Sequence, residues 1–380
     1  MKIDTKQITE TNKFVSKKEI KKNKERILTV FSNYRLQVNS ISVITGSAIS
    51  FYEVNLKPGI RVTKIKNLQD DITLSLARGT RIIIPRPYKD SIGIELPNKS
   101  PNKVSLKSII ASKEFQETKM ELPLAIGETI PNKSFIIDLV KAPHILVGGS
   151  GQEISDIINV ILASLLNKQH PSQIKFVLFD SKKTQLSTYS KIEKHYLAKN
   201  NNYGNAIITD IKKGEDTLKS LILEMEKRFI LLNKVKASNI KEYNDKLLTQ
   251  KANANSENKA LPYLVVVIND YTDLVMLADK SRIEMYIARI AQQASVVGIH
   301  LIIATQQIST NIITGVIKVN IPTRISFKTE SLIESRTIID ASGAQELIGQ
   351  GDMLINEGDY ITRVQSAQIN FNEKEEILVQ

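Results

Sequence analysis

The sequence contains no cysteine and no tryptophan, and only four of its 380 residues are histidines. The absence of cysteine excludes disulfides, thiolate metal sites and cysteine nucleophiles. The four histidines are scattered along the chain, which argues against a histidine-rich zinc site. No apolar run approaches the ~20 residues of a membrane-spanning helix, and the polar N-terminus lacks the apolar segment of a signal peptide. We therefore expect a soluble, cytoplasmic chain without a membrane segment.

Charge is unevenly distributed along a chain whose net charge is +12. Residues 1–140 contain 24 Lys and Arg against 14 Asp and Glu, whereas residues 141–380 contain 28 against 26. Much of the excess lies in a lysine-rich cluster at 17–26. A basic region beside a near-neutral one indicates a polyanionic partner, nucleic acid first and an anionic membrane second. A solvated helix face that aids solubility explains the cluster equally well.

The pattern of apolar residues divides the chain into four parts. Residues 1–26 form a lysine-rich arm or exposed helix, and residues 371–380 a polar tail. Short β-branched runs around a helical stretch at 65–77 predict a small α+β domain over 27–115. Residues 116–370 begin with a hairpin and then alternate apolar strands with helices. This alternation predicts an α/β domain with a mainly parallel sheet covered on both faces. Its expected strands are 145–147, 174–179, 264–268, 299–304 and 324–327, and its expected helices are 155–167, 215–232 and 282–294.

A glycine-rich turn follows the first of these strands and precedes a helix. This is the layout of a phosphate-binding P-loop, whose pattern is G-x-x-x-x-G-K-[ST]. The first Gly and the final Ser match with the correct spacing, but the second Gly and the Lys do not. Glycines after a strand also serve as plain turn residues, so the pattern alone leaves both interpretations open. The eight candidate residues are Gly148, Gly149, Ser150, Gly151, Gln152, Glu153, Ile154 and Ser155.

Two further strands of this region end in polar residues. Asn269 and Asp270 follow the strand at 264–268, and Gln306 follows Thr305 at the end of the strand at 299–304. The carboxyl ends of parallel strands meet at one edge of a sheet, which is where open α/β sheets bind ligands. The sequence therefore predicts one site built from three strand ends.

Longer stretches resemble the FtsK/SpoIIIE family of double-stranded DNA translocases. The resemblance covers roughly residues 28–365, and its stretches are 59–62, 70–72, 143–147, 176–183, 261–268, 287–315, 321–324, 335–340 and 349–354. It implies a RecA-like P-loop NTPase domain after a small α-domain, in a hexameric ring that surrounds DNA and uses ATP and Mg²⁺. The family's membrane segments and winged-helix domain have no counterpart in this sequence, so we expect DNA binding without sequence preference.

The departures from the family pattern fall on the catalytic positions. The resemblance places Glu153 and Ile154 where the family has the second Gly and the Lys of the P-loop. A carboxylate ~4 Å from a phosphate charge costs about 4 kcal/mol at an effective dielectric constant of 20. Asn269 takes the place of the Walker B Asp that holds Mg²⁺, and Asp270 replaces a catalytic Glu that is one methylene longer. Ser155 and Asp270 remain as the two candidate Mg²⁺ ligands.

Two other candidates each have a plain structural alternative. Gln306 corresponds to the family's polar γ-phosphate sensor, and its alternative is a hydrogen-bonded strand end. We predict that Arg336 reaches the nucleotide of a neighbouring subunit. The alternative role of this side chain is a structural ion pair with Asp340 at i+4. Ser181, Gln185 and the pair Gln307-Ile308 also differ from the Pro, Glu and Arg-Pro of the family.

We therefore predict a DNA-binding member of the family whose own ATP hydrolysis is impaired or lost. It would form a homo-hexamer, or act as an accessory subunit in a mixed ring with an active paralogue. The alternative is an active ATP-dependent DNA translocase of chromosome segregation and cell division, with Lys182 or Lys183 replacing the missing P-loop lysine. A third interpretation is a protein-interaction module that has lost DNA, against which the basic N-terminal third argues.

Overall fold

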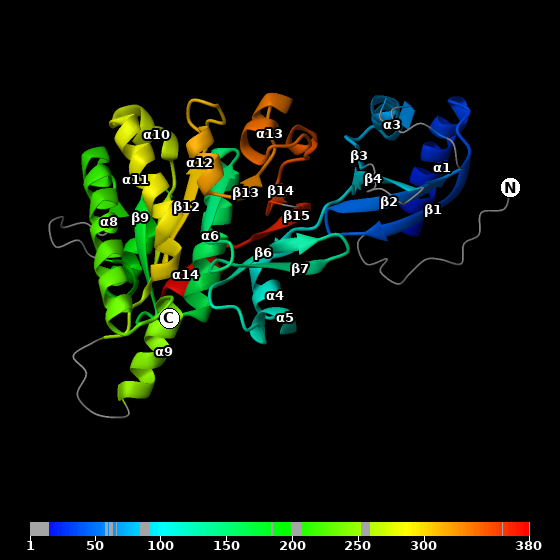
Figure 1. Ribbon diagram of the computed structural model, residues 1–380. Coiled ribbons are helices and arrows are strands. Elements are labelled where there is room, and N and C mark those ends of the chain that lie inside the picture. Colours follow the sequence, from blue (N-terminus) through cyan, green and yellow to red (C-terminus); the bar gives the residue numbers. More distant parts are fainter. Residues whose placement is uncertain are drawn as a thin grey trace.

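The computed structural model describes residues 15–57, 60, 64–65, 67–83, 91–183, 185–198, 207–251, 259–358 and 360–379. Most of the resembling stretch at 59–62 lies outside these residues, as does the segment 253–258, which its polar composition predicts to be a surface loop. A small N-terminal domain lies at one end of the molecule, beside a hairpin of the large domain (Figure 1). The two domains have separate hydrophobic cores, one in the small domain and one on each face of the large sheet.

The small domain is an antiparallel sheet covered by helices. Its strands lie in the order β1 (Val38–Thr45), β2 (Ile49–Leu56), β4 (Ser91–Pro97) and β3 (Arg81–Ile83), and its helices include α1 (Lys17–Asn33) and α3 (Gln69–Leu76). Helix α1 begins at Lys17 because the hydroxyl of Ser16 accepts the N–H of Glu19, which satisfies a free donor of the first turn. Ile27 and Phe31, one turn apart, are fully buried against the sheet. The lysine-rich cluster is therefore the solvent side of a helix that belongs to this domain.

The large domain contains one mixed sheet. Its main path, among the described residues, is β10 (Ile207–Ile208), β9 (Ile174–Phe179), β11 (Tyr263–Ile268), β12 (Ile299–Thr305), β8 (His144–Gly148), β13 (Thr323–Ser326), β14 (Asp352–Asn356), β15 (Ile361–Gln368), β6 (Pro123–Thr129) and β7 (Lys133–Asp138). In this spatial order, the strands from β10 through β9, β11, β12 and β8 to β13 run parallel. The sheet then continues in antiparallel pairs through β14, β15, β6 and β7. β5 (Val104–Ser105) pairs with β15.

Helices cover both faces of this sheet, which explains why its parallel strands are apolar throughout. In β11, Val265 and Val267 face one core while Val266 and Ile268 face the other. The first face carries α4 (Leu106–Ile110), α5 (Lys113–Gln116), α6 (Gly151–Lys168), η1 (Ser187–Ile192) and α14 (Phe371–Val379), and the second carries α8 (Ile211–Lys234), α10 (Tyr271–Leu277), α11 (Lys280–Gln293), α12 (Gly315–Asn320) and α13 (Leu332–Ile339). The remaining helices are α7 (Glu193–Tyr196), α9 (Ile240–Lys251), η2 (Ala294–Val297) and η3 (Ala344–Glu346). This architecture confirms the predicted fold class, α/β with a mainly parallel sheet after a small α+β domain.

The C-terminal segment differs from the polar tail expected over 371–380. Residues Phe371–Val379 form helix α14, and Leu378 is buried in the core beneath α6. The ammonium group of Lys374 lies 4.7 Å from the centre of the Tyr189 ring, and Lys191 forms an ion pair with Glu375. The segment is rich in charge because those charges face η1 and solvent, while Ile377 and Leu378 pack against the core beside α6.

A buried ion-pair network joins the two domains. Arg363 of β15 pairs with Glu95 of β4 and, at 2.5 Å, with Asp352 of β14. All three side chains are nearly inaccessible to solvent, at 5% exposure or less. Arg81 of β3 also contacts Glu95, at 3.4 Å, and lies 3.9 Å from Glu346. Separating the two domains would leave buried charges without their partners, which is costly. This network therefore holds the small domain against the large one.

Replacing Glu95 by Gln is expected to lower the free energy of unfolding by about 2 kcal/mol. The substitution removes one buried charge from Arg363, which keeps Asp352 as a partner. The matched control is Glu346→Gln, since its partly exposed and longer contact predicts a loss below about 1 kcal/mol. Urea unfolding of both variants measures the difference, and equal losses would show that burial at Glu95 adds nothing.

Candidate nucleotide site at the carboxyl edge of the sheet

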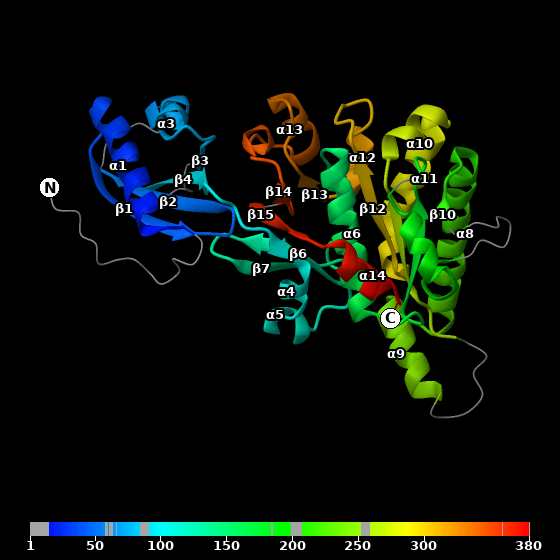
Figure 2. The same cartoon turned by 180° about the vertical axis from the view of Figure 1, so that it is seen from behind.

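The predicted site residues lie along one edge of the large sheet. β12 lies between β8 and β11, so Gln306 follows the strand that separates the glycine-rich turn from Asn269 and Asp270. Helices α10, α12 and α13, which follow β11, β12 and β13, line the same edge (Figures 1 and 2). The structure therefore brings the three strand ends together, as the alternation of strands and helices predicted.

The turn between β8 and α6 is only two residues long. β8 ends at Gly148 and α6 begins at Gly151, four residues before the start that the sequence analysis assigned at Ser155. Ser150 is the N-cap, and its hydroxyl accepts the N–H of Glu153 at 3.4 Å. Ser155, half-buried, consequently lies inside the second turn of the helix. Residues 151–153 would belong to the phosphate-binding loop in the P-loop pattern, but here they form part of the first turn of α6.

Glu153 contacts the N-cap residue of α6 and a distant loop through its carboxylate. Its carboxylate accepts a hydrogen bond from the Ser150 hydroxyl at 3.0 Å, and its other oxygen accepts the N–H of Gly351 at 3.4 Å. A carboxylate in the first turn also interacts favourably with the positive end of the helix dipole. The negative charge that a phosphate would bring to this helix end is thus already supplied by a side chain.

Ile154, which the sequence pattern predicts to stand at the position of the P-loop lysine, points into the core. Its side chain is fully buried in the cluster that includes Ile157, Ile158 and Ile161 of the same helix. The early start of α6 turns this position toward the sheet, away from the edge where ligands bind. The position therefore differs from a P-loop lysine in both charge and direction.

The glycines of the turn are closely packed by side chains from other elements. A Cβ atom on Gly148 would lie 2.2 Å from Cδ1 of Ile338, and one on Gly149 would lie 2.7 Å from Cβ of Phe327. A Cβ on Gly151 would lie 3.1 Å from the side-chain amide of Gln306. The plain turn interpretation of these glycines thus has a physical basis, and Gln306, which is exposed, lies directly over the start of α6.

Three buried acidic or amide side chains end β9 and β11. Asp180 follows β9, and Asn269 follows β11 beside it, since the Asn269 N–H donates to the carbonyl of Phe179 at 3.2 Å. The exposures of Asp180, Asn269 and Asp270 are 1%, 4% and 7%. Each has a buried Oδ1 atom without a hydrogen-bond partner among the described residues. The edge thus presents unsatisfied acceptors, which favour a donor or a cation.

Lys182 supplies a cation to this group. Its ammonium lies 2.5 Å from Oδ2 of Asp270. The pKa of Lys182 is raised, first by this hydrogen bond and then by the charges of Asp270, Asp273 and Asp180, against a lowering by burial. Lys182 is therefore held by Asp270 and not by the glycine-rich turn. This position differs from the one expected of a substitute for the P-loop lysine.

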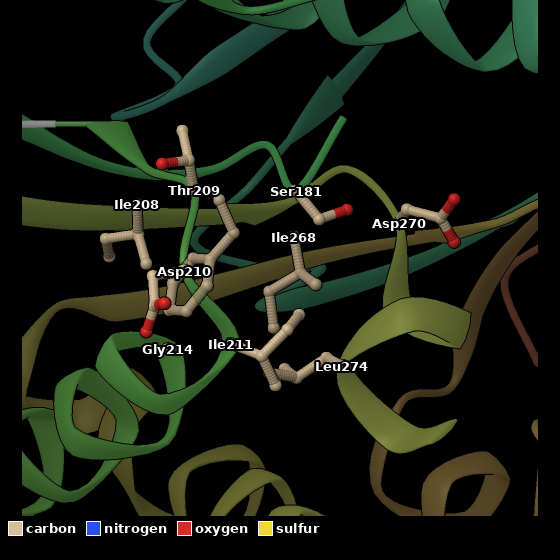
Figure 3. A pocket seen from close by; sticks show the side chains of 10 residues that line it. Ser181, Ile208, Thr209, Asp210, Ile211, Gly214, Ile268, Asp270 and Leu274 are labelled. Atoms are coloured by element: carbon tan, nitrogen blue, oxygen red, sulfur yellow. The ribbon is translucent and has the colours of Figure 1, made fainter. Parts of the chain in front are cut away.

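A small pocket adjoins Asp270 on the α8 face of the sheet. It has an empty volume of about 280 Å³, and Figure 3 shows Ser181 and Asp270 on its border above an apolar floor. The Ser181 hydroxyl donates to Asp273 at 2.6 Å, and Asp210 caps α8 by accepting the N–H of Lys213. The remaining lining residues are Phe179, Ile208, Thr209, Ile211, Gly214, Ile268 and Leu274.

These residues do not fit a triphosphate with Mg²⁺ in the way a P-loop does. Such a group needs backbone N–H donors, a lysine and a charged metal ligand at the strand end. Here the helix start carries a carboxylate, the lysine position is buried isoleucine, and Asn269 is neutral. Within the described ranges, no three His, Asp or Glu side chains are arranged to hold a metal ion.

Arg336 is exposed on α13 and forms no ion pair with Asp340. The carboxylate of Asp340 instead pairs with Lys318 and Arg324, so the i+4 alternative is wrong. Within the part of the chain that the structure describes, the Arg336 guanidinium has no hydrogen-bond or ion-pair partner. The structural ion pair with Asp340 is thus absent, and a contact of Arg336 with a neighbouring subunit's nucleotide stays a prediction.

Replacing Arg336 by Ala should therefore change the free energy of unfolding by less than about 0.5 kcal/mol. The matched substitution is Arg324→Ala on the other side of Asp340. Arg324 is buried, and its loss should cost about 2 kcal/mol because Asp340 and the Ile338 carbonyl lose a charged donor. Thermal unfolding of the two variants measures this difference, and a large loss in Arg336→Ala would assign it a structural role.

Sequence reasoning missed two features of this edge. One is the pair of contacts made by Gln185, whose side-chain N–H₂ donates to the Gly151 carbonyl at 3.3 Å while its backbone N–H donates to Asp180 at 3.1 Å. The other is the early start of α6, although the order Ser-x-x-Glu at 150–153 is the sequence pattern of a capping box. The contact between Lys182 and Asp270 spans 88 residues and has no local sequence signature.

Comparison with known families supports the resemblance. The model of the FtsK/SpoIIIE family matches residues 105–310, and the FtsK alpha domain matches residues 3–98. DNA translocase FtsK of Chlorobaculum tepidum is 38% identical over 367 residues, covering 95% of this chain and 44% of the relative. In Bacillus subtilis, DNA translocase SftA is 41% identical over 340 residues (89% and 34%), and SpoIIIE is 37% identical over 372 residues (97% and 46%). The chain thus spans less than half the length of these three relatives.

Solved structures support the fold. The pCW3 conjugation coupling protein TcpA, solved as a monomer with ATPγS, superposes with a TM-score of 0.62 at 23% identity, covering 94% of this chain and 99% of that one. The cytoplasmic domain of the type VII secretion ATPase EccC from Thermomonospora curvata gives a TM-score of 0.59 at 17% identity, covering 73% and 34%. The fold is therefore that of P-loop ATPases. No helix among the described residues is both long and apolar enough to cross a membrane.

Proposed function

Because this chain belongs to the FtsK/SpoIIIE family, we propose that it is a DNA-binding motor subunit of the DNA translocase type whose own ATP hydrolysis is impaired. The observation that carries the proposal is the early start of α6, where Ser150 caps a helix that takes up part of the expected phosphate-binding loop. Ile154 is buried where the family has a lysine, and Asn269 is neutral where it has a metal ligand. Each change removes attraction for a bound phosphate or metal, and together they act on one site.

Double-stranded DNA is the proposed partner, bound without sequence preference. The supporting feature is the basic N-terminal third, whose exposed lysines include Lys17, Lys18, Lys21 and Lys22 on α1. Phosphate contacts of this kind release counterions, so affinity falls steeply with salt. A homo-hexamer, or a mixed ring with an active relative, gives the exposed and unpaired Arg336 a nucleotide to reach in a neighbouring subunit.

DNA binding measured with and without ATP tests this proposal. We expect the fluorescence anisotropy of a long labelled duplex to report an affinity that falls by at least about tenfold between 50 mM and 200 mM salt and is unchanged by Mg-ATP. K17Q/K18Q/K22Q should flatten the salt dependence. K219Q/K227Q/K234Q, which removes three exposed lysines from α8, should not. Affinity without salt dependence would favour a protein-interaction module, and affinity that changes with ATP would favour a working motor.

The second candidate is an active translocase with an atypical P-loop. One observation favours it, namely that Oδ1 of Asp270 is buried at the strand end without a hydrogen-bond partner among the residues that the structure describes. In that mechanism Ser155, Asp270 and Gln306 would carry metal binding and phosphate sensing, and Lys182 or Lys183 would supply the missing charge. Unchanged nucleotide affinity in Lys182→Ala and Lys183→Ala would show that neither lysine replaces the missing P-loop lysine.

A further inference from the structure

We propose that the small domain is held on the large one at three separate places, so that the two domains move as one rigid unit and do not pivot about their junction. The first place is the buried network of Arg363, Glu95 and Asp352. The second is the tip of the β6–β7 hairpin, and the third is the loop before η3. The inference goes beyond the proposed function, because it concerns how the domains are coupled and not what they bind.

The tip of the β6–β7 hairpin is hydrogen-bonded to the turn between β1 and β2 of the small domain. Oδ1 of Asn132 accepts the N–H of Ser47 at 2.7 Å, and its Nδ2 donates to the carbonyl of Thr45 at 3.3 Å. The φ angle of Asn132 is 62°, in the left-handed region that Asn adopts more readily than most residues. The hairpin lies beside the small domain in both views (Figures 1 and 2). One side chain therefore satisfies two backbone groups of the other domain.

The chain segment that connects the domains is attached to the same turn. The side-chain N–H₂ of Asn98 donates to the carbonyls of Gly46 at 2.8 Å and Ser47 at 3.2 Å. The N–H of Asn102 also donates to the Ser47 carbonyl, at 2.9 Å. Lys103 is the one residue between this contact and β5, which pairs with β15 of the large sheet. The connection itself therefore leaves little length of chain about which the domains could pivot.

The loop before η3 contacts the other side of the small sheet, at β3. A Cβ atom on Gly343 would lie 2.9 Å from Nη2 of Arg81, which shows how closely this loop approaches the guanidinium. Arg81 also lies 3.9 Å from Glu346 of the large domain and 3.4 Å from Glu95 of its own domain. Because Glu95 pairs with Arg363 as well, this contact continues into the buried network.

The three places are too far apart in the fold to share one pivot. They come from the hairpin, from β15 and from the loop before η3, and they reach the β1–β2 turn at one side of the small sheet and β3 at the other. A rotation that keeps one contact would separate the partners of the others, which leaves buried charges or amides unpaired. Domains with polar interfaces usually move against each other. This junction differs because its polar contacts are buried or half-buried and lie on both sides of the small sheet.

The distance between two spin labels, one on each domain, tests this proposal by pulsed electron paramagnetic resonance. The chain has no cysteine, so N33C on α1 and K107C on α4, both at exposed positions, direct the labels without further changes. We expect one narrow distance distribution that neither long duplex DNA nor Mg-ATP shifts. In the same background N132G/E95Q, which removes two of the three attachments, should broaden the distribution or add a second distance. Lys133→Gln, at the exposed neighbour of Asn132, is the matched control and should leave the distribution unchanged.

Two results would overturn the inference. A broad or two-peaked distribution in the labelled chain without any ligand would mean that the junction is a hinge, and it would leave the proposed function untouched. A distribution that stays equally narrow in N132G/E95Q would mean that these contacts do not hold the domains. Asn132→Gly alone keeps the left-handed backbone and all the ion pairs, so it provides a milder variant in which a smaller broadening is expected. Circular dichroism verifies that each variant is folded.

Discussion

A lysine introduced at position 154 is expected to unfold the chain and not to create ATP binding. Ile154 is fully buried in the core under the first turn of α6. A lysine there must either bury its charge or deprotonate, and a pKa shift of 3–5 units corresponds to about 4–7 kcal/mol. We therefore expect Ile154→Lys to lose at least about 4 kcal/mol of unfolding free energy in urea.

Two matched substitutions separate charge from packing at this helix start. Ile154→Val should cost about 1 kcal/mol, because it removes one buried methyl group. Gln152→Lys, on the exposed side of the same turn, should change stability by less than about 0.5 kcal/mol. The double variant E153G/I154K should share the defect of Ile154→Lys, since it also loses the carboxylate of Glu153. An Ile154→Lys chain as stable as Gln152→Lys, and further stabilised by ATP, would mean that the turn reopens into a phosphate-binding loop.

Mild acid is expected to destabilise the chain through two buried histidines at the opposite edge of the sheet. His144 and His300 start neighbouring strands, and their ring centres are 6.3 Å apart. His144 accepts the N–H of Leu301, and His300 contacts the Pro143 carbonyl at 3.0 Å. Burial lowers the pKa of His144 to about 3, with a further lowering from His300, and burial lowers the pKa of His300 to about 4.

Both folded-state values lie below 6.5, so the unfolded chain takes up more protons as the pH falls. Stability is therefore complete above about pH 6.5 and is lost progressively down to about pH 3–4. At pH 5 each histidine should account for about 2 kcal/mol of this loss. Urea unfolding between pH 8 and pH 5 measures it. The variant H144Q/H300Q should show a shallower dependence, and an unchanged slope in that variant would assign the acid sensitivity to other groups.

The sheet could be predicted from the sequence because each parallel strand is marked by residues that are adjacent in the chain. Runs such as Leu264–Ile268 are apolar on both faces, which only a covered parallel strand explains, and the polar residues after them mark the ligand edge. The same reasoning did not identify β14 and β15 as strands, and it treated the charged segment at 371–380 as a tail. The charges of α14 find partners in distant parts of the chain, and periodicity carries no information about those contacts.

The sequence placed the candidate residues at one edge of the sheet but did not give their local geometry. A pattern match across eight residues placed the helix start at Ser155, whereas local capping chemistry places it at Gly151. The Ser150 hydroxyl satisfies a free N–H group of the first turn directly, and this local gain favours the observed register of α6. The pairing of Lys182 with Asp270 depends on how β9 and β11 align, which residue spacing alone does not give.

ATP turnover by the purified chain, with and without long duplex DNA, tests the central claim most directly. The matched background is Asp270→Asn, which removes the carboxylate at the end of β11 and measures contaminating ATPase. The account predicts turnover indistinguishable from that background in both conditions, by a chain that still binds DNA. Turnover that rises with DNA and is lost in Asp270→Asn would contradict it and would show that this helix start supports a working motor.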